Sequence, residues 1–264
     1  MPHTPIQEKI FRLLRENRNP ESHIPRASVL HRDPGSPRFS GDIDLFHDEV
    51  RLVAENAERD VATLRSAGIA VEWVTRNESF HRAWASTGEE RLKLEWVFDS
   101  AFRFFPVEPD PLLGYRLHPA DLATNKVLAA AGRRVIRDFL DVMHLHETYL
   151  PLGALVWAAT GKDPGLSPLF ILNELVRTSK YREEDIQDVQ LSRPVSLVEL
   201  KQKLLGAVRA AEELVSRLPA DDLGCLYLDA TGKVVTPDPA AAEFATLTRH
   251  FGCMRGSWPR AAAD

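Results

Sequence analysis

Residues 36–46 read Ser-Pro-Arg-Phe-Ser-Gly-Asp-Ile-Asp-Leu-Phe, and their Asp42-Ile43-Asp44 core sets two carboxylates one residue apart. Side chains in a β-strand point to alternate faces, so the stretch predicts a strand in which Asp42 and Asp44 share one face while Ile43 and Leu45 enter the core. Like charges this close repel each other unless a proton or a cation lies between them, and oxygen ligands at this spacing suit Mg²⁺. Metal-dependent phosphoryl chemistry is the first hypothesis; a solvated turn is the alternative that an isolated Asp-x-Asp pair leaves open.

The composition of the 264-residue chain is that of a globular protein, with 44% apolar and 27% charged residues. A formal net charge of −5 gives no support for a surface that binds nucleic acid all over, although a local basic patch stays possible. Cys225 and Cys253 are too few for a disulfide scaffold, which favours a cytoplasmic protein. No segment reads as a targeting sequence, and the longest apolar run, 150–159, is too short to span a membrane.

The N-terminal part of the chain has the periodicity of a mixed α/β module. Apolar spacing predicts helices over 5–14 and 48–68, and alternation predicts strands over 42–46, 70–75, 80–85 and 91–98. In the last strand, Leu92, Leu94, Trp96 and Phe98 alternate with polar positions and are expected to face the core. Residues 1–116 are therefore predicted to form one domain.

The remainder of the chain is predominantly helical. Prolines at 106, 109 and 111 mark a linker, and helical period predicts helices over 121–131, 135–149, 168–178, 183–188 and 197–218. A hairpin is predicted over 225–235, around Asp229-Ala230-Thr231-Gly232. The fold class is therefore α+β, a small mixed-sheet module followed by a helical domain over 117–264.

Two further sets of charged residues extend the aspartate pair. Lys93-Leu94-Glu95 offers Glu95 as a third carboxylate, with Lys93 beside it to meet a phosphate; Asp99 competes for the same role, and a simple Glu95–Lys93 ion pair is the structural alternative. In the helix around 138, Asp138 and Asp141 lie on neighbouring surface, where an Arg137–Asp141 ion pair is the alternative to a functional role.

Four motifs occur in order: Arg38-Phe39-Ser40-Gly41-Asp42-Ile43-Asp44, Lys93-Leu94-Glu95, Asp121-Leu122-Ala123-Thr124-Asn125-Lys126 and Arg137-Asp138-Phe139-Leu140-Asp141. Together they resemble the AbiEii/AbiGii toxin family of nucleotidyltransferases, within the DNA polymerase β-like superfamily. The resemblance covers about residues 22–146. It implies transfer of a nucleoside monophosphate from an NTP to a hydroxyl, often at a tRNA 3′ end, by the toxin of a toxin–antitoxin pair.

The resemblance also implies roles for individual residues. Asp42, Asp44 and Glu95 would bind Mg²⁺ or Mn²⁺, and Glu95 would help to deprotonate the attacking hydroxyl. Lys126 would meet the phosphates, with Asp138 or Asp141 orienting it or the acceptor. The remaining nucleotide contacts would come from matching motif positions, namely Ser28, Arg38, Ser40 and Lys93. The partners would be the NTP, an acceptor such as tRNA and an antitoxin protein, with no membrane partner.

One motif of the family is missing. Its glycine-rich turn should fall near Arg26-Ala27-Ser28, where this sequence has no glycine, and Gly35-Ser36 is too close to Asp42 to replace it. Glycine matters there because a residue without Cβ lets backbone amides approach a triphosphate. Nucleotide binding is therefore expected to be weak.

Three other functions fit parts of the sequence. A small-molecule nucleotidyltransferase of the antibiotic-modifying kind would use the same carboxylates, and a non-catalytic interaction protein would fit the lost glycines. His47-Asp48 raises an HD-type phosphohydrolase, but here the dipeptide follows a strand. His144 and His146 would splay around a helix, which disfavours a metal site between them.

Overall fold

The computed structural model describes residues 3–25 and 36–259. Contacts within the chain divide it into two compact units, Met1–Ala101 with Pro106–His118 and Phe102–Phe105 with Pro119–Asp264. Residues 102–105 group with the second unit because β6 (Phe102–Arg103) pairs with β11 (Cys253–Met254). The α+β fold class is confirmed, with a mixed sheet in the first unit and mostly helices in the second.

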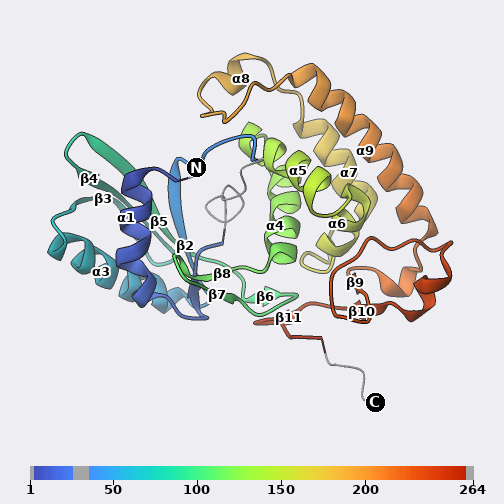
Figure 1. Cartoon of the computed structure of the whole chain (residues 1–264), viewed down its shortest axis with the longest axis horizontal. Coiled ribbons are helices and arrows are strands. Elements are labelled where there is room, and N and C mark those ends of the chain that lie inside the picture. Colours follow the sequence, from blue (N-terminus) through green and yellow to red (C-terminus); the bar gives the residue numbers. More distant parts are fainter. Residues whose placement is uncertain (1–2, 26–35, 260–264) are drawn as a thin grey trace. The chain divides into compact units, whose positions relative to one another are not determined.

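The first unit is built on a five-stranded sheet of order β1-β2-β5-β4-β3 (Figure 1). Its strands are β1 (Ser22–His23), β2 (Asp42–His47), β3 (Ala70–Asn77), β4 (Phe80–Thr87) and β5 (Glu90–Phe98). β2 and β5 pair in parallel, and the other neighbours are antiparallel. The long strands agree with the alternation in the sequence. The unit also holds a short hairpin, β7 (Glu108–Asp110) with β8 (Gly114–Arg116).

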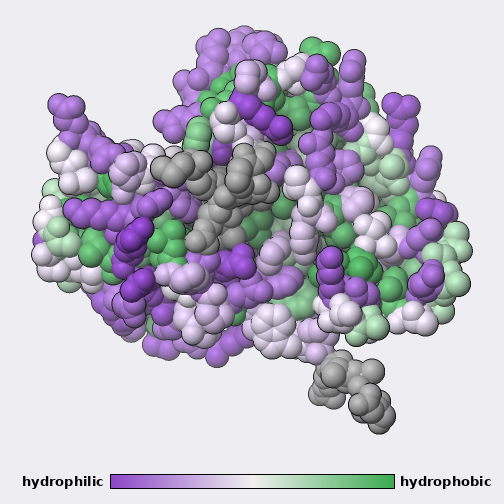
Figure 2. All heavy atoms as spheres, viewed as in Figure 1, coloured by the Kyte–Doolittle hydropathy of each residue, from purple (hydrophilic) through white to green (hydrophobic). Residues whose placement is uncertain are grey.

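Two helices cover the apolar face of this sheet. α1 (Pro5–Leu14) begins with a capping box in which Thr4 and Gln7 bond each other's backbone N–H, and α3 (Val50–Ser66) contributes Val53, Ala57, Val61 and Leu64. They pack with Ile43, Leu45, Leu94 and Trp96 in one hydrophobic core. The outward face of α1 is hydrophilic (Figure 2), as expected where Lys9 and Arg12 are exposed.

A buried ion pair crosses this core. Arg18 and Asp60 both have fully buried side chains, and the Arg18 guanidinium contacts both oxygens of Asp60 at 2.5 and 2.6 Å. Asp60 also accepts hydrogen bonds from Trp96 and Asn17, each at 2.8 Å. Donors from Arg18, Asn17 and Trp96 therefore converge on the Asp60 carboxylate and offset its loss of hydration.

His47, at the end of β2, is a buried base without such compensation. Neither ring nitrogen has a hydrogen-bond partner within the described residues, and burial, followed by the charges of Arg18 and His81, lowers the pKa of His47 to about 3. An unfolded histidine titrates near pH 6.5. The unfolded state therefore binds more protons between these values, so the folded state loses stability as the pH falls from about 6.5 toward 3.

We expect His47→Leu to make the protein more resistant to acid, because the replacement cannot take up that proton. The slope is limited to about 1.4 kcal/mol per pH unit for one group. Circular dichroism during acid titration should show unfolding at lower pH in the variant, with similar urea stability of both proteins at pH 8. An identical acid transition would exclude His47 as its cause.

The second unit is a bundle of helices followed by short strands. Its helices are α4 (Pro119–Gly132), α5 (Ile136–Thr148), α6 (Leu152–Ala159), α7 (Pro168–Thr178), α8 (Glu184–Gln187) and α9 (Leu197–Arg217). α6, which the sequence left unassigned because of Pro151 and Gly153, is buried along its whole length and packs against α4, α7 and α9. Pro151 precedes the helix as its N-cap, where its missing N–H costs nothing.

One local expectation is wrong. Phe98 is 40% exposed, because β4 pairs with β5 only as far as Val97 and leaves the last residue of β5 without that neighbour. The hairpin predicted over 225–235 is present in a short form: Leu228 bridges to Val234, and the N–H groups of Asp229 and Val235 donate to the backbone oxygens of Lys233 and Tyr227. β9 (Leu226–Leu228) also pairs with β10 (Thr248–His250). In the described ranges, no helix has the length and apolar character needed to cross a membrane.

Candidate functional site

The sheet of the first unit brings the predicted carboxylates together on one face. In the parallel register of β2 and β5, Asp42 lies beside Lys93 and Asp44 beside Glu95. Ile43 and Leu94, between them, are fully buried on the opposite face. Alternation along both strands therefore places all three carboxylates and Lys93 on the face away from α1 and α3.

Two cations hold these carboxylates. The Lys93 ammonium lies 3.3 Å from Asp42 Oδ2 and 3.1 Å from Glu95 Oε1. Arg82, on β4, adds an ion pair of 2.6 Å to the same oxygen of Glu95. The Glu95 side chain is 12% exposed and Asp42 15%, so the cluster is partly shielded from water. The Glu95–Lys93 pairing considered from the sequence is thus present, but it belongs to a larger network.

The pKa of Glu95 depends on its burial and on the charged groups around it. Burial raises the pKa of Glu95, but the hydrogen bond and charge of Lys93, with hydrogen bonds from Asp44 and Arg82, outweigh burial and leave this pKa below its usual value. Asp44 and Glu95 occupy neighbouring register positions on β2 and β5. Two carboxylates so placed repel each other unless a proton or a cation lies between them.

This donor set fits Mg²⁺ or Mn²⁺ by its chemistry. Carboxylate oxygens from adjacent strand positions are the hard ligands that these ions prefer, and a divalent cation would offset the repulsion between the carboxylates. Among residues 3–25 and 36–259, however, no three His, Cys, Asp or Glu side chains are arranged to hold a metal ion as they stand. Lys93 instead neutralises Asp42 and Glu95.

Arg38 and Ser40 lie in the segment that leads into β2, and both are buried. Ser40 Oγ donates to the backbone oxygen of Asp42, and Gln7, from α1, donates to the backbone oxygen of Ser40 at 2.9 Å. Arg38 donates to the backbone oxygen of Phe39 at 3.1 Å. These bonds fix the start of the strand that presents Asp42. Ser28, with Arg26 and Ala27, lies outside the described residues.

The second unit carries the other predicted residues as a buried ion cluster between α4 and α5. The Lys126 ammonium lies 2.6 Å from Asp141 Oδ2 and 3.4 Å from Asp138 Oδ1. Arg133 bonds the second oxygen of Asp138 at 2.7 Å. Lys126 and both aspartates are at most 8% exposed in their side chains, whereas Arg133 is 49% exposed. Asp141 therefore pairs with Lys126, a residue far from it in sequence.

Asp121, which opens the third motif, has a structural role. Its oxygens accept the backbone N–H groups of Phe104 and Phe105 at 2.8 and 3.0 Å. Lys162 completes the arrangement with an ion pair of 2.7 Å to Asp121, whose side chain is fully buried. No local pattern points to Lys162, because this contact joins α4 to a loop residue 41 positions after Asp121 in the chain.

We expect Asp121→Ala to destabilise the second unit by about 3–5 kcal/mol, because it removes the hydrogen-bond acceptor of two backbone N–H groups and the carboxylate that pairs with Lys162. Urea unfolding provides the measurement. Asp99→Ala is the control, since Asp99 accepts only the exposed N–H of Ser100 and should change stability by less than about 0.5 kcal/mol. Equal stability of the two variants would contradict the structural role of Asp121.

The competing sequence motifs do not form sites in this fold. Asp99 follows β5 and lies beyond the register position opposite Asp44, which Glu95 occupies. His47 is buried on the helix-covered side, and no helical histidine partner joins it within the described residues, which disfavours an HD-type hydrolase. His146 Nδ1 accepts the N–H of Leu152 at 3.0 Å and thus supports the start of α6.

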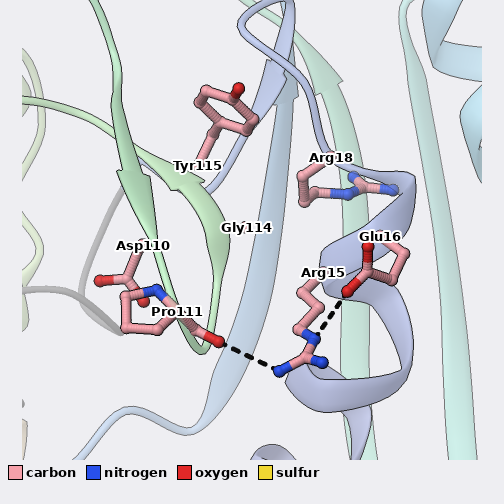
Figure 3. A pocket seen from close by; sticks show the side chains of 7 residues that line it. All are labelled: Arg15, Glu16, Arg18, Asp110, Pro111, Gly114 and Tyr115. Carbon is pink, nitrogen blue, oxygen red and sulfur yellow. Dashed lines mark hydrogen bonds and ion pairs between the residues drawn. The ribbon is translucent and has the colours of Figure 1, made fainter.

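A separate cavity of about 400 Å³ lies in the first unit, between the end of α1 and the β7–β8 turn (Figure 3). Its charged groups already have partners: Arg15 contacts Glu16 at 2.9 Å and the oxygen of Pro111 at 3.3 Å, while Arg18 pairs with Asp60. Gly114 approaches the backbone oxygen of Arg15 with φ of 78°, which only glycine tolerates there. The cavity is a packing feature, separate from the carboxylate cluster.

Arg82 was not predicted from the sequence, yet its position could have been. Buried Ala83 and Ala85 alternate with Arg82 and Trp84 along β4. The two-residue turn at Gly88-Glu89, with φ of 59° at Gly88, fixes the register that sets Arg82 opposite Glu95. Recognising Gly88-Glu89 as a two-residue hairpin turn would have predicted that Arg82 lies opposite Glu95.

Comparison with known proteins shows to which family the chain belongs. The model of the family described as nucleotidyl transferase AbiEii toxin, type IV toxin–antitoxin system, matches residues 28–212. Two solved structures share the fold, JHP933 of Helicobacter pylori (20% identity, TM-score 0.52, 80% of this chain and 90% of that one) and the nucleotidyltransferase toxin MenT4 of Mycobacterium tuberculosis (16% identity, TM-score 0.55, 82% and 83%). No curated protein matches. The chain therefore belongs to the AbiEii family of nucleotidyltransferase toxins.

Proposed function

We propose that this nucleotidyltransferase is metal-dependent and transfers a nucleoside monophosphate from an NTP to a tRNA 3′ end, as the toxin of a toxin–antitoxin pair in the cytoplasm. The observation that supports this most is the register of β2 and β5, which sets Asp42, Asp44 and Glu95 on one face. Bound Mg²⁺ or Mn²⁺ would orient the triphosphate and offset charge on the transferring phosphoryl group. Asp42, Asp44 and Glu95 would hold it.

The surrounding residues have distinct roles in this proposal. Glu95, ionised at neutral pH because Lys93 lowers its pKa, accepts a hydrogen bond from the attacking hydroxyl and orients it. Lys93 and Arg82, 24% and 39% exposed, exchange their carboxylate partners for phosphate oxygens. Arg38 and Ser40 hold the entry to β2, and Ser28 is proposed to contact the NTP on the strength of its motif position alone.

We propose that Lys126 contacts the triphosphate by exchanging the longer of its two ion pairs for a phosphate oxygen. Asp141, at 2.6 Å, would keep the ammonium oriented, while the 3.4 Å contact with Asp138 would give way to a phosphate oxygen. Asp138 would keep Arg133 as its partner. This division of roles explains why two carboxylates accompany one lysine.

Calorimetric titration with each of the four Mg-NTPs tests the proposal. We expect one binding site for at least one NTP, with binding lost when Asp42 and Asp44 are both replaced by Asn. Asp99→Asn, which changes a carboxylate outside the cluster, should bind as the wild type does. If no NTP binds at millimolar concentration, the chain is instead a non-catalytic interaction protein on the same fold.

A further inference from the structure

The sheet face that carries the carboxylates continues across β4 with two aromatic side chains. In the antiparallel register of β4 and β5, Trp84 lies beside Lys93, Arg82 beside Glu95 and Phe80 beside Val97. The three β4 side chains therefore share the face of the catalytic cluster. The apolar core of this unit lies on the other face, through Ala83, Ala85 and Trp96, so the two rings are not needed to fill it.

An arginine is stacked on each of these rings. The guanidinium carbon of Arg91 lies 4.5 Å from the centroid of the Trp84 ring, and that of Arg82 lies 5.1 Å from the centroid of Phe80. Both rings are half-buried, with one face of each covered by its arginine. Such pairs present a flat apolar surface and a positive charge at the same place.

The arginines are able to change partners. Arg91 pairs with Glu72 at 3.0 Å and Arg82 pairs with Glu95 at 2.6 Å, and the two arginine side chains are 51% and 39% exposed. The Arg91–Glu72 pair is exposed on both sides and contributes little to stability, so replacing this carboxylate by a phosphate oxygen costs little, whereas Arg82 would exchange the shielded Glu95 for an equally charged phosphate. Guanidinium groups also bind phosphates with two hydrogen bonds.

The direction of the acceptor follows from the order of the strands. The proposed function assigns the attacking hydroxyl to Glu95 on β5 and two of the metal ligands, Asp42 and Asp44, to the neighbouring β2. β4 is the other neighbour of β5, and its side of the cluster is where the acceptor would continue. Phe80 and Trp84 are about 13 Å apart along the strand, enough to contact two different bases.

We propose that Trp84 and Phe80 stack on unpaired bases near the end of a single-stranded RNA acceptor, while Arg91 and Arg82 contact its phosphates. Aromatic rings next to guanidinium groups suit single strands because each base has an open face. The inference rests on the proposed function and adds the residues that position the acceptor.

Fluorescence anisotropy with a labelled single-stranded RNA octamer tests this proposal in the full chain, with a blunt RNA duplex as the comparison probe. We expect the wild type to bind the single strand more tightly than the duplex. Trp84→Ala should weaken single-strand binding at least fivefold, whereas Trp84→Phe should stay within about twofold of the wild type. Arg91→Ala should also weaken binding.

Arg76→Ala is a matched control on the other face of the same sheet, on β3. Arg76 lies 4.8 Å over Trp73 and pairs with Glu58, just as Arg91 lies over Trp84 and pairs with Glu72. Trp73, however, packs against the core. Arg76→Ala should therefore leave RNA binding unchanged, and the melting temperature of each variant shows that it is folded.

Three results would overturn the inference: no RNA binding by the wild type, equal binding of single strand and duplex, or unchanged binding in Trp84→Ala. Mg-NTP titration of the same proteins separates this failure from failure of the proposed function. If the wild type binds NTP, and Trp84→Ala binds RNA as tightly as the wild type does, only the proposed stacking site is wrong. If the wild type binds neither NTP nor RNA, both are wrong.

Discussion

Replacing Asp42 and Asp44 together with Asn is expected to reduce nucleotidyl transfer by at least about a thousandfold, equivalent to roughly 4 kcal/mol of transition-state stabilisation. Both residues lie beside β5 in register with Lys93 and Glu95, so their loss leaves Glu95 as the one remaining carboxylate of the three-residue cluster. An amide cannot provide the charge that a divalent ion requires. The measurement is the rate of incorporation of labelled NTP into total tRNA.

The same double replacement should leave the fold intact. Lys93 is 24% exposed and keeps Glu95 as a partner, so the change in unfolding free energy is expected to stay below about 1 kcal/mol. Asp99→Asn serves as the control for both rate and stability. A double variant that retains a tenth of the wild-type rate would show that the aspartate pair does not hold the metal.

Lys126→Met is expected to lower the free energy of unfolding by about 3–5 kcal/mol. The Lys126 ammonium is the partner of Asp141, whose side chain is fully buried, and it also contacts Asp138. Removing it leaves a buried negative charge between α4 and α5. Urea unfolding followed by circular dichroism measures the loss.

Arg133→Met provides the matched control, because it removes the exposed cation of the same cluster. The Arg133 side chain is 49% exposed, so its loss should cost less than about 1 kcal/mol. Adding Asp141→Leu to Lys126→Met should restore part of the stability, since the buried Asp141 charge is then removed together with its cation. If the single and double variants were equally unstable, the loss of the Lys126 cation from Asp141 would not be the cause.

The fold around the carboxylates could be predicted because alternation is a local signal. Ile43 and Leu45 on β2, and Leu94 and Trp96 on β5, mark the buried side of each strand. Because alternate residues point to opposite faces, Asp42, Asp44 and Glu95 are then predicted to lie on the other side. The ordered motifs then related these strands to each other. The same logic fails at Phe98, where the end of a neighbouring strand, not the pattern of Phe98 itself, decides its exposure.

The rest of the site depends on contacts between residues distant in sequence. Nothing near Asp121 indicates that it binds the backbone of 104–105, or that Lys162 completes its environment. Likewise, helical spacing suggested Arg137 as the partner of Asp141, whereas packing of α4 on α5 supplies Lys126. Such pairings are set by tertiary structure, which periodicity does not encode.

The central claim is that the chain moves a nucleoside monophosphate, using the Asp42, Asp44 and Glu95 cluster with a divalent metal. The most direct measurement incubates the protein and total tRNA with NTP labelled at either the α- or the γ-phosphate, with Mg²⁺ or with EDTA. We expect that RNA acquires the α-label only, that the released pyrophosphate carries the γ-label, and that EDTA stops the transfer of the α-label and the release of pyrophosphate. Transfer of the γ-label to RNA, or equal α-label transfer in EDTA, would contradict it.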